Sequence, residues 1–260
     1  MIIKKTPAEI EKMRVAGAAV AWCLDQIVKR IEPGKTTTLD IDRIAEELIR
    51  SHGWVSSFKN YRGYPNTVCV AVNEEVVHGI PGDRVLKAGD IVGIDLGIAV
   101  DGWHADAAVT IAVGGTASKE AERLLRVTRE ALYKGIEQAR PGRHLSDIGH
   151  AIQEHVERHG FSVVRDLVGH GIGRSLHEDP QVPNYGKPGR GIRLEEGMTL
   201  AIEPMVNAGG FAVETLGDSW TVVSKDRSLS AHFEHTVAIR RDGPDILTVL
   251  PAGEAVGIDA

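Results

Sequence analysis

Four acidic residues and one histidine stand in five short segments that have the pattern of strand ends or tight turns. They are Asp95 in GIDLG, Asp106 in GWHADAA, His170 in GHGIG, Glu203 in AIEPM and Glu234 in HFEHT. Burying an acidic side chain in apolar, β-rich surroundings costs free energy unless a positive charge neutralises it. Four carboxylates carry about four negative charges, which two divalent cations would balance. The set therefore predicts a dinuclear metal centre.

The ligand types narrow the choice of metal. Oxygen ligands with a single imidazole suit Mn, Fe(II) or Co better than a structural zinc site, which usually takes Cys and His. The glycines around His170 leave its imidazole accessible. Taken one at a time, these residues have other interpretations. An Asp near a turn is often a cap, a Glu in a strand is often solvated, and a glycine-flanked His is often structural.

The bulk properties are those of an ordinary globular protein, with 42% hydrophobic and 25% charged residues in a chain of 260. A net charge of −6 argues against a nucleic-acid backbone as a partner. The two cysteines, Cys23 and Cys69, exclude a disulfide scaffold and fit a reducing compartment. Because the N-terminus lacks an apolar signal core and no run reaches the length of a membrane span, we expect a cytoplasmic protein.

Local signals predict the elements that must position these residues. Thr6-Pro7-Ala8-Glu9 has the form of a capping box, and apolar residues recur at helical spacing from there to Glu32-Pro33-Gly34. A second helix is expected from Leu39 to Ser51. Strands are predicted over Asn66 to Val72, Ile91 to Val100, and Trp103 to Val113.

A hairpin turn between the last two of these strands fixes the register of two acidic residues. Asp101-Gly102 is a strong two-residue turn signal, so Val100 is expected to pair with Trp103 and Asp95 with Ala108. Asp106 lies two residues from Ala108 on the same strand. The two carboxylates thus become diagonal neighbours on one face, within reach of shared cations.

Glu203 is predicted at the end of one further strand, and Glu234 is predicted within another. Glu203 precedes Pro204, which restricts it to an extended conformation after a strand over Met198 to Ile202. Around Glu234 the polarity alternates, so His232, Glu234 and Thr236 are expected on one face and the residues between them on the other.

The second half of the chain repeats part of the first. The segment from Pro33 to Trp54 matches the segment from Pro141 to Phe161, with Pro-Gly, Asp-Ile and His-Gly-aromatic in the same order. A helix from Ser118 to Gln138 would open the second unit as the Thr6 helix opens the first. Either the match is fortuitous, or two related units pack about a pseudo-twofold axis. No flexible linker separates them, which favours one domain made of two halves.

The five segments belong to longer motifs within a resemblance that runs from the Thr6 helix to about Leu250. These are YRGYPNTVCVAVNEEVVHGIP, GDIVGIDLGIAVDGWHADAAVT, VGHGIGRSLHEDPQVPNY, EGMTLAIEPM and SAHFEHTVAI. In this order they resemble the type I methionine aminopeptidases, members of the pita-bread metallopeptidase family. The resemblance implies an α+β fold with an antiparallel sheet, flanking helices and two pseudo-twofold halves. The halves, about residues 1–115 and 116–250, would form one catalytic domain over residues 1–260.

The resemblance also assigns roles at the metal centre. Asp95 would hold one divalent cation (Co, Mn, Fe(II) or Zn), and Asp106 and Glu234 would bridge two. His170 and Glu203 would complete the second site, with Glu203 also acting as general base. A water between the cations would be acidified, and one cation would bind the free N-terminal amine of the substrate.

Two histidines and a pocket complete the expected site. The resemblance implies that His78 lies near the scissile amide and that His177 polarises its carbonyl. Residues matching the pocket for the methionine side chain are Tyr61, Tyr64, Cys69 and Trp220; simple core packing is the other interpretation for these four. Three departures from the family pattern, Phe58, Gly97 and Leu176, put the pocket shape and the rate in doubt but not the reaction.

The family implies nascent polypeptide N-termini as substrates, with a small second residue, and a monomeric enzyme. Ribosome association would suit that substrate, although no basic tail indicates it, and neither direct nucleic-acid nor membrane binding is expected. Prolidases and aminopeptidase P share the ligand set but usually carry an extra N-terminal domain. The type II methionine enzymes carry a helical insertion, and a non-catalytic binding protein on this fold would lack ligands.

Overall fold

The computed structural model describes residues 2–250 and contains four α-helices and fifteen β-strands within that range. The helices are α1 (Pro7–Val28), α2 (Thr38–Ser51), α3 (Lys119–Ile136) and α4 (Leu145–Arg158). The first five strands are β1 (Val55–Ser56), β2 (Cys69–Val72), β3 (Glu75–Val77), β4 (Ile91–Val100) and β5 (Trp103–Ala112). The next five are β6 (Ser162–Val163), β7 (Gly169–Gly171), β8 (Glu178–Val182), β9 (Thr199–Ile202) and β10 (Met205–Asn207). The last five are β11 (Val213–Thr215), β12 (Val222–Ser224), β13 (Ser230–His232), β14 (Glu234–Arg240) and β15 (Gly243–Ile246).

The predicted start of the first helix is confirmed, but its end comes earlier than the apolar spacing indicated. The Thr6 hydroxyl accepts the Glu9 backbone N–H, and the Glu9 carboxylate accepts the Thr6 backbone N–H at 2.8 Å. The helix ends at Val28, and residues 29–32 form a turn and irregular structure before Pro33, a residue that cannot continue a helix. None of the helices in residues 2–250 is long and apolar enough to cross a membrane.

The segments that match in sequence also match in structure. Helices α2 and α4 are each 14 residues long, and each is followed by a two-residue strand, β1 or β6. In both helices an aspartate at the third position, Asp40 or Asp147, accepts the backbone N–H of the N-cap residue at 2.9 Å. Helix α3, predicted from Ser118 to Gln138, runs from Lys119 to Ile136 with Ser118 as its N-cap.

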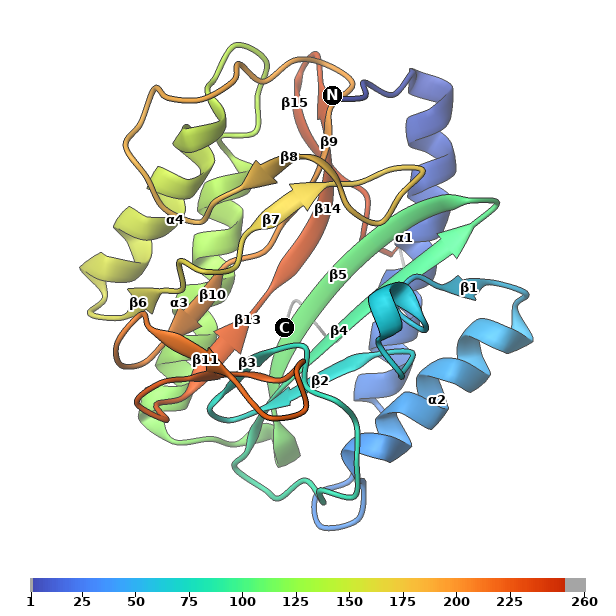
Figure 1. The fold of residues 1–260 in the computed structure, drawn as a ribbon, viewed down its shortest axis with the longest axis vertical. Coiled ribbons are helices and arrows are strands. Elements are labelled where there is room, and N and C mark those ends of the chain that lie inside the picture. Colours follow the sequence, from blue (N-terminus) through green and yellow to red (C-terminus); the bar gives the residue numbers. More distant parts are fainter. Residues whose placement is uncertain (1, 251–260) are drawn as a thin grey trace.

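The strands form one large antiparallel sheet and two small ones. The large sheet has the order β1-β4-β5-β14-β9-β7-β8, with β2 added to β4 and β15 added to β14. Figure 1 shows the long β4–β5 hairpin and β14 crossing the middle of the molecule, with α1 and α2 on one side and α3 and α4 on the other. The predicted antiparallel α+β architecture is confirmed.

The hairpin has the register that its turn predicted. Val100 pairs with Trp103 and Asp95 pairs with Ala108. Asp101 and Gly102 both have positive φ values, 51° and 74°, as the mirror-image turn of a two-residue hairpin requires. The strand predicted from Asn66 begins only at Cys69, because the backbone N–H groups of Thr67 and Val68 donate to the buried Asp42 carboxylate instead of a neighbouring strand.

The first and second halves of the large sheet meet at β5 and β14, where only two residue pairs are in direct register, Glu234 with Ala108 and His235 with Ala107. Threonine hydroxyls extend this seam on both sides. Thr236 Oγ1 accepts the Asp106 N–H at 2.9 Å and donates to the Asp106 carbonyl at 2.8 Å. Thr110 Oγ1 bonds the N–H and carbonyl of His232 in the same way, at 3.0 and 2.7 Å. The seam is therefore held by side chains where the strands diverge.

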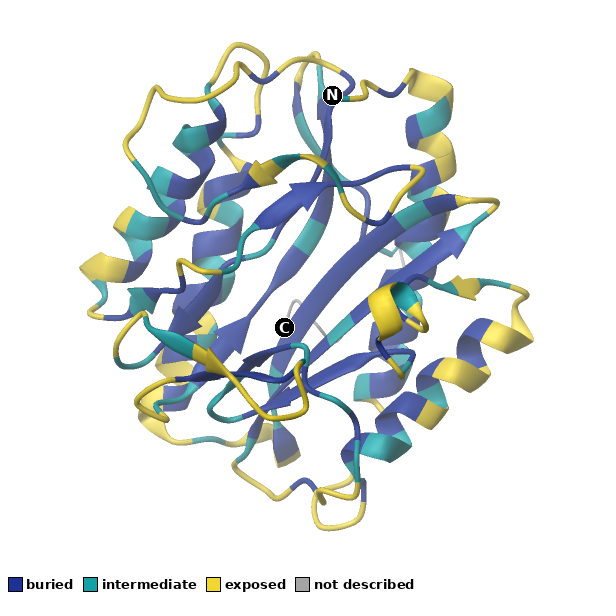
Figure 2. Ribbon diagram, in the orientation of Figure 1, coloured by how far each residue is buried: buried dark blue, intermediate teal, exposed yellow. Residues whose placement is uncertain are grey.

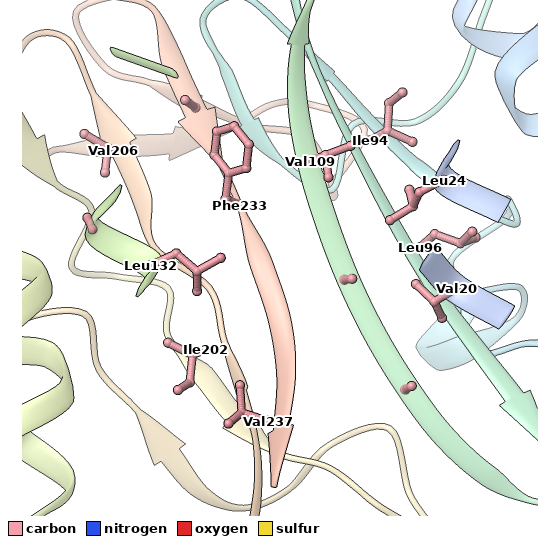
Figure 3. Close-up of a cluster of buried hydrophobic side chains, with 14 of the residues drawn as sticks. Val20, Leu24, Ile94, Leu96, Val109, Leu132, Ile202, Val206, Phe233 and Val237 are labelled. Atoms are coloured by element: carbon pink, nitrogen blue, oxygen red, sulfur yellow. The ribbon is translucent and has the colours of Figure 1, made fainter. Parts of the chain in front are cut away.

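One cluster of buried apolar side chains continues across both halves. Figure 3 shows Val20 and Leu24 of α1 packed toward Ile94 and Leu96 of β4, and the same cluster reaches Val237 of β14. Figure 2 shows the long central strands almost entirely buried, while exposed residues collect on loops and on the outer helix faces. The strands of the sheet centre thus have little freedom to move apart, which fixes the side chains they carry.

Candidate metal centre

The five predicted ligands lie on five strands that are neighbours in the large sheet. In the order β4, β5, β14, β9 and β7, the strands carry Asp95, Asp106, Glu234, Glu203 and His170. Glu203 follows directly after the last residue of β9. Asp95 and Glu234 both stand opposite Ala108, so they flank β5 on the same row. Residues separated by up to 139 positions in sequence are thereby brought to one place.

The carboxylates and the imidazole approach one another closely enough to share cations. One ligand atom from each of Asp106, His170 and Glu234 lies within 4.8 Å of the others. Buried oxygens of Asp95, Asp106 and Glu234 lack hydrogen-bond partners within the described chain. Buried polar atoms in proteins almost always have partners, so these oxygens are fitted for a cation.

The electrostatics point the same way. Burial raises the pKa of Asp106 to about 7. Burial together with the charge of Asp106 raises the pKa values of Asp95, Glu203 and Glu234 well above the usual range. Without a cation these groups would have to bind protons near neutral pH, and bound cations would displace those protons.

His170 is prepared to act as a ligand through one specified nitrogen. Its Nδ1 lies 2.8 Å from the Gly171 carbonyl, which can only accept, so Nδ1 carries the proton. Its Nε2 therefore keeps a lone pair and lies 3.6 Å from Glu203 Oε1. Burial lowers the pKa of His170 to about 4, which keeps the imidazole neutral, as metal binding requires.

A small pocket opens beside this cluster and contains every residue predicted for the site. Its volume is about 150 Å³. The lining residues are Phe58, Tyr61, Arg62, Tyr64, Cys69, His78, Asp95, Asp106, His170, Leu176, His177, Glu203, Trp220 and Glu234. A larger cavity of about 550 Å³, between the end of β5 and α3, contains none of the predicted residues, so size alone does not identify the site.

The two predicted histidines outside the ligand set both line the pocket, and each lies beside a different aromatic side chain. The ring of His177 stacks on Tyr61 with centroids 5.2 Å apart and lies 4.0 Å from the ring of His170. Burial lowers the pKa of His177 to about 3, so it is neutral near pH 7. His78 has a φ of 58°, an unusual conformation for a residue other than glycine, and its ring faces Trp220 at 6.4 Å.

Cys69 and Tyr64 line the pocket and are almost fully buried. Cys69 pairs with Asp95 between β2 and β4. Burial, together with the charge of Asp95, raises the pKa of the Cys69 thiol well above its usual range, which disfavours the reactive thiolate. The Tyr64 hydroxyl lies 3.0 Å from the carbonyls of both Val68 and Gly79, and its ring meets Trp220 edge to face.

The structure adds two residues that the sequence did not single out. Arg62 lines the pocket and lies over the ring of Tyr61 at 5.4 Å. His232, the last residue of β13, lies 3.8 Å from Glu203 Oε2 and 3.9 Å from Glu234 Oε2 through its Nε2. The only sequence signal for His232 is the alternation in HFEHT, which predicts that His232 and Glu234 share a face.

Two of the three departures from the family pattern are in contact with each other. A Cβ built on Gly97 would lie 2.8 Å from Phe58 Cε1 and 2.9 Å from Ser57 Cβ. Phe58 therefore fills the space that a side chain at position 97 would need. Leu176 is buried in the pocket wall in the same apolar cluster as Phe58.

Comparison with known proteins agrees with this geometry. Residues 11–241 match the model of metallopeptidase family M24. Methionine aminopeptidase 1 of Bacillus subtilis is 55% identical over 248 residues, which is 95% of this chain and 99% of that protein. The crystal structure of methionine aminopeptidase from Thermotoga maritima has a TM-score of 0.93 and 51% identity, covering 96% of this chain and all of that chain.

A more distant similarity shows how widely the fold is shared. The prolidase from Pyrococcus horikoshii has a TM-score of 0.76 with 22% identity, covering 97% of this chain and 65% of that chain. At this identity the likeness shows the fold alone. The pita-bread fold predicted from the sequence is confirmed by these structural matches.

Proposed function

The chain belongs to metallopeptidase family M24, and we propose that it removes the N-terminal methionine from polypeptides by hydrolysing the first peptide bond. The observation that carries the proposal is the row of five predicted ligands on adjacent strands, lining a pocket with two further histidines and four aromatic side chains. The high identity to methionine aminopeptidases over nearly the full chain supports it.

The residues at the centre suit two divalent cations. Asp95 would hold one, Asp106 and Glu234 would bridge both, and His170 with Glu203 would complete the second. When bound, a pair of cations lowers the pKa of a shared water and supplies hydroxide near neutral pH. The four carboxylates and neutral imidazole match the charge and ligand type of Mn, Fe(II), Co or Zn.

The protein side chains then carry the remaining steps. We assign Glu203 to accept a proton from the attacking water, because it lines the pocket and, like Asp95 but unlike Asp106 and Glu234, its side chain is not fully buried. Neutral His177 donates a hydrogen bond to the substrate carbonyl oxygen as negative charge develops there. His78, which also lines the pocket, hydrogen-bonds the amide nitrogen of the leaving residue.

The size of the pocket supports a single short side chain as its occupant. A volume of about 150 Å³ is below the range of about 300–1,000 Å³ that drug-sized ligands fill. Its walls are mostly apolar and aromatic, from Phe58, Tyr61, Tyr64, Leu176 and Trp220, which suits the unbranched thioether of methionine. The resemblance to methionine aminopeptidases further supports a preference for a small second residue in the substrate.

We further propose that the chain is one catalytic domain that acts as a monomer in the cytoplasm on nascent N-termini. The continuous apolar core through both halves supports a single unit. The negative net charge gives no basis for direct nucleic-acid binding, so association with the ribosome would require a protein contact.

One assay separates this proposal from a proline-specific peptidase. The protein is loaded with Mn, Fe(II) or Co and offered Met-Ala-Ser and Ala-Pro-Ala, and release of the first residue is followed. We expect methionine release only, and none after chelation. Release of alanine without methionine would assign the chain to the proline-specific enzymes. Release of neither residue with any of these metals would contradict a catalytic function.

A further inference from the structure

His232 is a buried histidine beside the metal ligands whose Nε2 has no hydrogen-bond partner within the described residues. The residue is only 3% exposed. Leaving a buried nitrogen unpaired costs free energy, so an unpaired nitrogen that points at carboxylates calls for an explanation. Two carboxylate oxygens face it, Glu203 Oε2 at 3.8 Å and Glu234 Oε2 at 3.9 Å.

These distances favour a shared cation over a hydrogen bond. A hydrogen bond between nitrogen and oxygen spans about 2.7–3.2 Å, so both separations are too long. Two donor atoms that are each about 2.1 Å from one cation lie about 3.0 Å apart at a right angle and about 3.8 Å apart at about 130°. His170 Nε2 and Glu203 Oε1, both proposed ligands, have the similar separation of 3.6 Å.

The backbone of His232 is held on both sides, which fixes the direction of its side chain. On one side it pairs with Met205 of β10. On the other, Thr110 Oγ1 accepts its N–H and donates to its carbonyl. One ligand atom from each of Glu203, His232 and Glu234 lies within 4.8 Å of the others, as for the set of Asp106, His170 and Glu234. The two sets share Glu234.

We propose that His232 Nε2 is a sixth protein ligand of the dinuclear centre, binding the cation that Glu203 and Glu234 hold. The proposal rests on the proposed metal centre and deepens it. It makes the two halves of the centre chemically unequal. The cation on the Asp95 side meets only carboxylates, whereas the other meets imidazole nitrogen from both His170 and His232.

This inequality predicts a selective order of loading. Imidazole favours Fe(II), Co and Zn, while carboxylates suit Mn and Mg. The nitrogen-rich position should therefore take the first equivalent of Co(II) or Zn(II), and the carboxylate position should fill later. Removing His232 should bring the two positions closer in affinity.

The test uses the metal-stripped full chain, titrated with Co(II) by calorimetry without oxygen. His232→Gln should weaken the first equivalent about 10- to 100-fold, the loss typical when a group that supports a metal site is removed. His235→Gln is the matched control. His235 lies three residues away, and its Nδ1 bonds the Thr248 hydroxyl rather than facing the carboxylates, so this variant should leave the Co(II) affinity unchanged. Thermal melts by circular dichroism establish that both variants fold.

A second measurement needs no variant. In the proton NMR spectrum of the wild-type protein with one Co(II), two coordinated imidazoles should each give hyperfine-shifted resonances. One set of imidazole resonances, or equal Co(II) affinity of wild type and His232→Gln, would overturn the proposal. Methionine release by the same Co(II)-loaded wild-type protein is scored separately. Its absence would refute the proposed function, and its presence with unchanged metal binding in His232→Gln would refute only the role of His232.

Discussion

Substituting Gly97 by alanine is expected to destabilise the protein through a clash with one pocket residue. The new Cβ would lie 2.8 Å from Phe58 Cε1, whereas carbon atoms in contact are about 3.5–4.0 Å apart, an overlap of about 0.7–1.2 Å. Ser57 Cβ, at 2.9 Å, blocks the other direction, and its chain is anchored because Ser57 N–H donates to the Gly97 carbonyl. Phe58 must therefore move toward the pocket.

The expected cost is that of overpacking a core, about 1–3 kcal/mol. For a protein of this size, 2 kcal/mol lowers the melting temperature by about 4–8 °C. Since Phe58 lines the pocket, KM for methionyl peptides should rise more than kcat falls. The substitution Phe58→Leu removes Cε1 and leaves the Ser57 contact, so Gly97→Ala should cost about 1 kcal/mol less in that background.

Urea denaturation of the metal-free protein gives the free energies of unfolding for this cycle. Gly93→Ala is the matched control, because Gly93 lies on the same strand and face and its nearest contact, with the Thr110 hydroxyl oxygen, is at 3.4 Å. That change should be neutral or stabilising by up to about 1 kcal/mol. If Gly97→Ala and Phe58→Leu add within about 0.5 kcal/mol, the clash with Phe58 is not the cause.

Three further predictions concern catalysis, a buried ion pair and pH. His78→Ala should keep its metal content by atomic absorption while losing most turnover of Met-Ala-Ser; full activity would remove its assigned role. Lys5→Met should lower the free energy of unfolding, measured by urea denaturation, by about 3–5 kcal/mol, because it breaks a buried ion pair in which the Lys5 and Glu178 side chains are 3% and 7% exposed. Lys4→Met breaks the exposed ion pair with Glu195 and should lower it by at most about 1 kcal/mol. The pKa of Asp106 is raised from 3.8 to about 7, so its protonation stabilises the metal-free fold below pH 4, and this contribution is lost as pH rises toward 7. Melting temperatures with chelator should fall over that interval, and those with Mn should not; parallel curves would contradict the assignment.

The sequence predicts those parts of the centre that local chemistry determines. The Asp101-Gly102 turn fixes which residues face each other, so the neighbourhood of Asp95 and Asp106 follows from their distances to the turn. The alternation around Glu234 predicts one strand through His232 and Thr236, whereas the structure divides this segment at Phe233 into β13 and β14. The placement of Glu203 and His170 at the same site is predicted only by the order of the family motifs, because no local sequence signal relates these two residues.

The remaining features depend on contacts between segments that are distant in sequence. The role of His232 depends on Glu203, which follows another strand, so the alternation gives its face but not its neighbour. Phe58 and Gly97 are separate departures in the sequence and become one compensating pair only in the structure. The strand expected from Asn66 starts later because the Thr67 N–H donates to the Asp42 carboxylate on α2. Strand propensity cannot predict this contact between distant segments.

The threonine-bridged seam between β5 and β14 has a consequence for how the halves stay together. Asp95 and Asp106 come from one half, and Glu203, Glu234 and His170 come from the other, so neither half holds a complete ligand set. Cations bound across the seam would therefore bind fully only when the two halves are packed together. Their binding free energy would then add to the stabilisation of the seam by the Thr110 and Thr236 hydroxyl groups. The N–H groups of Asp106 and His232 donate to those hydroxyls. Slower amide hydrogen exchange at these two residues when cations are added would show that the cations hold the two halves together.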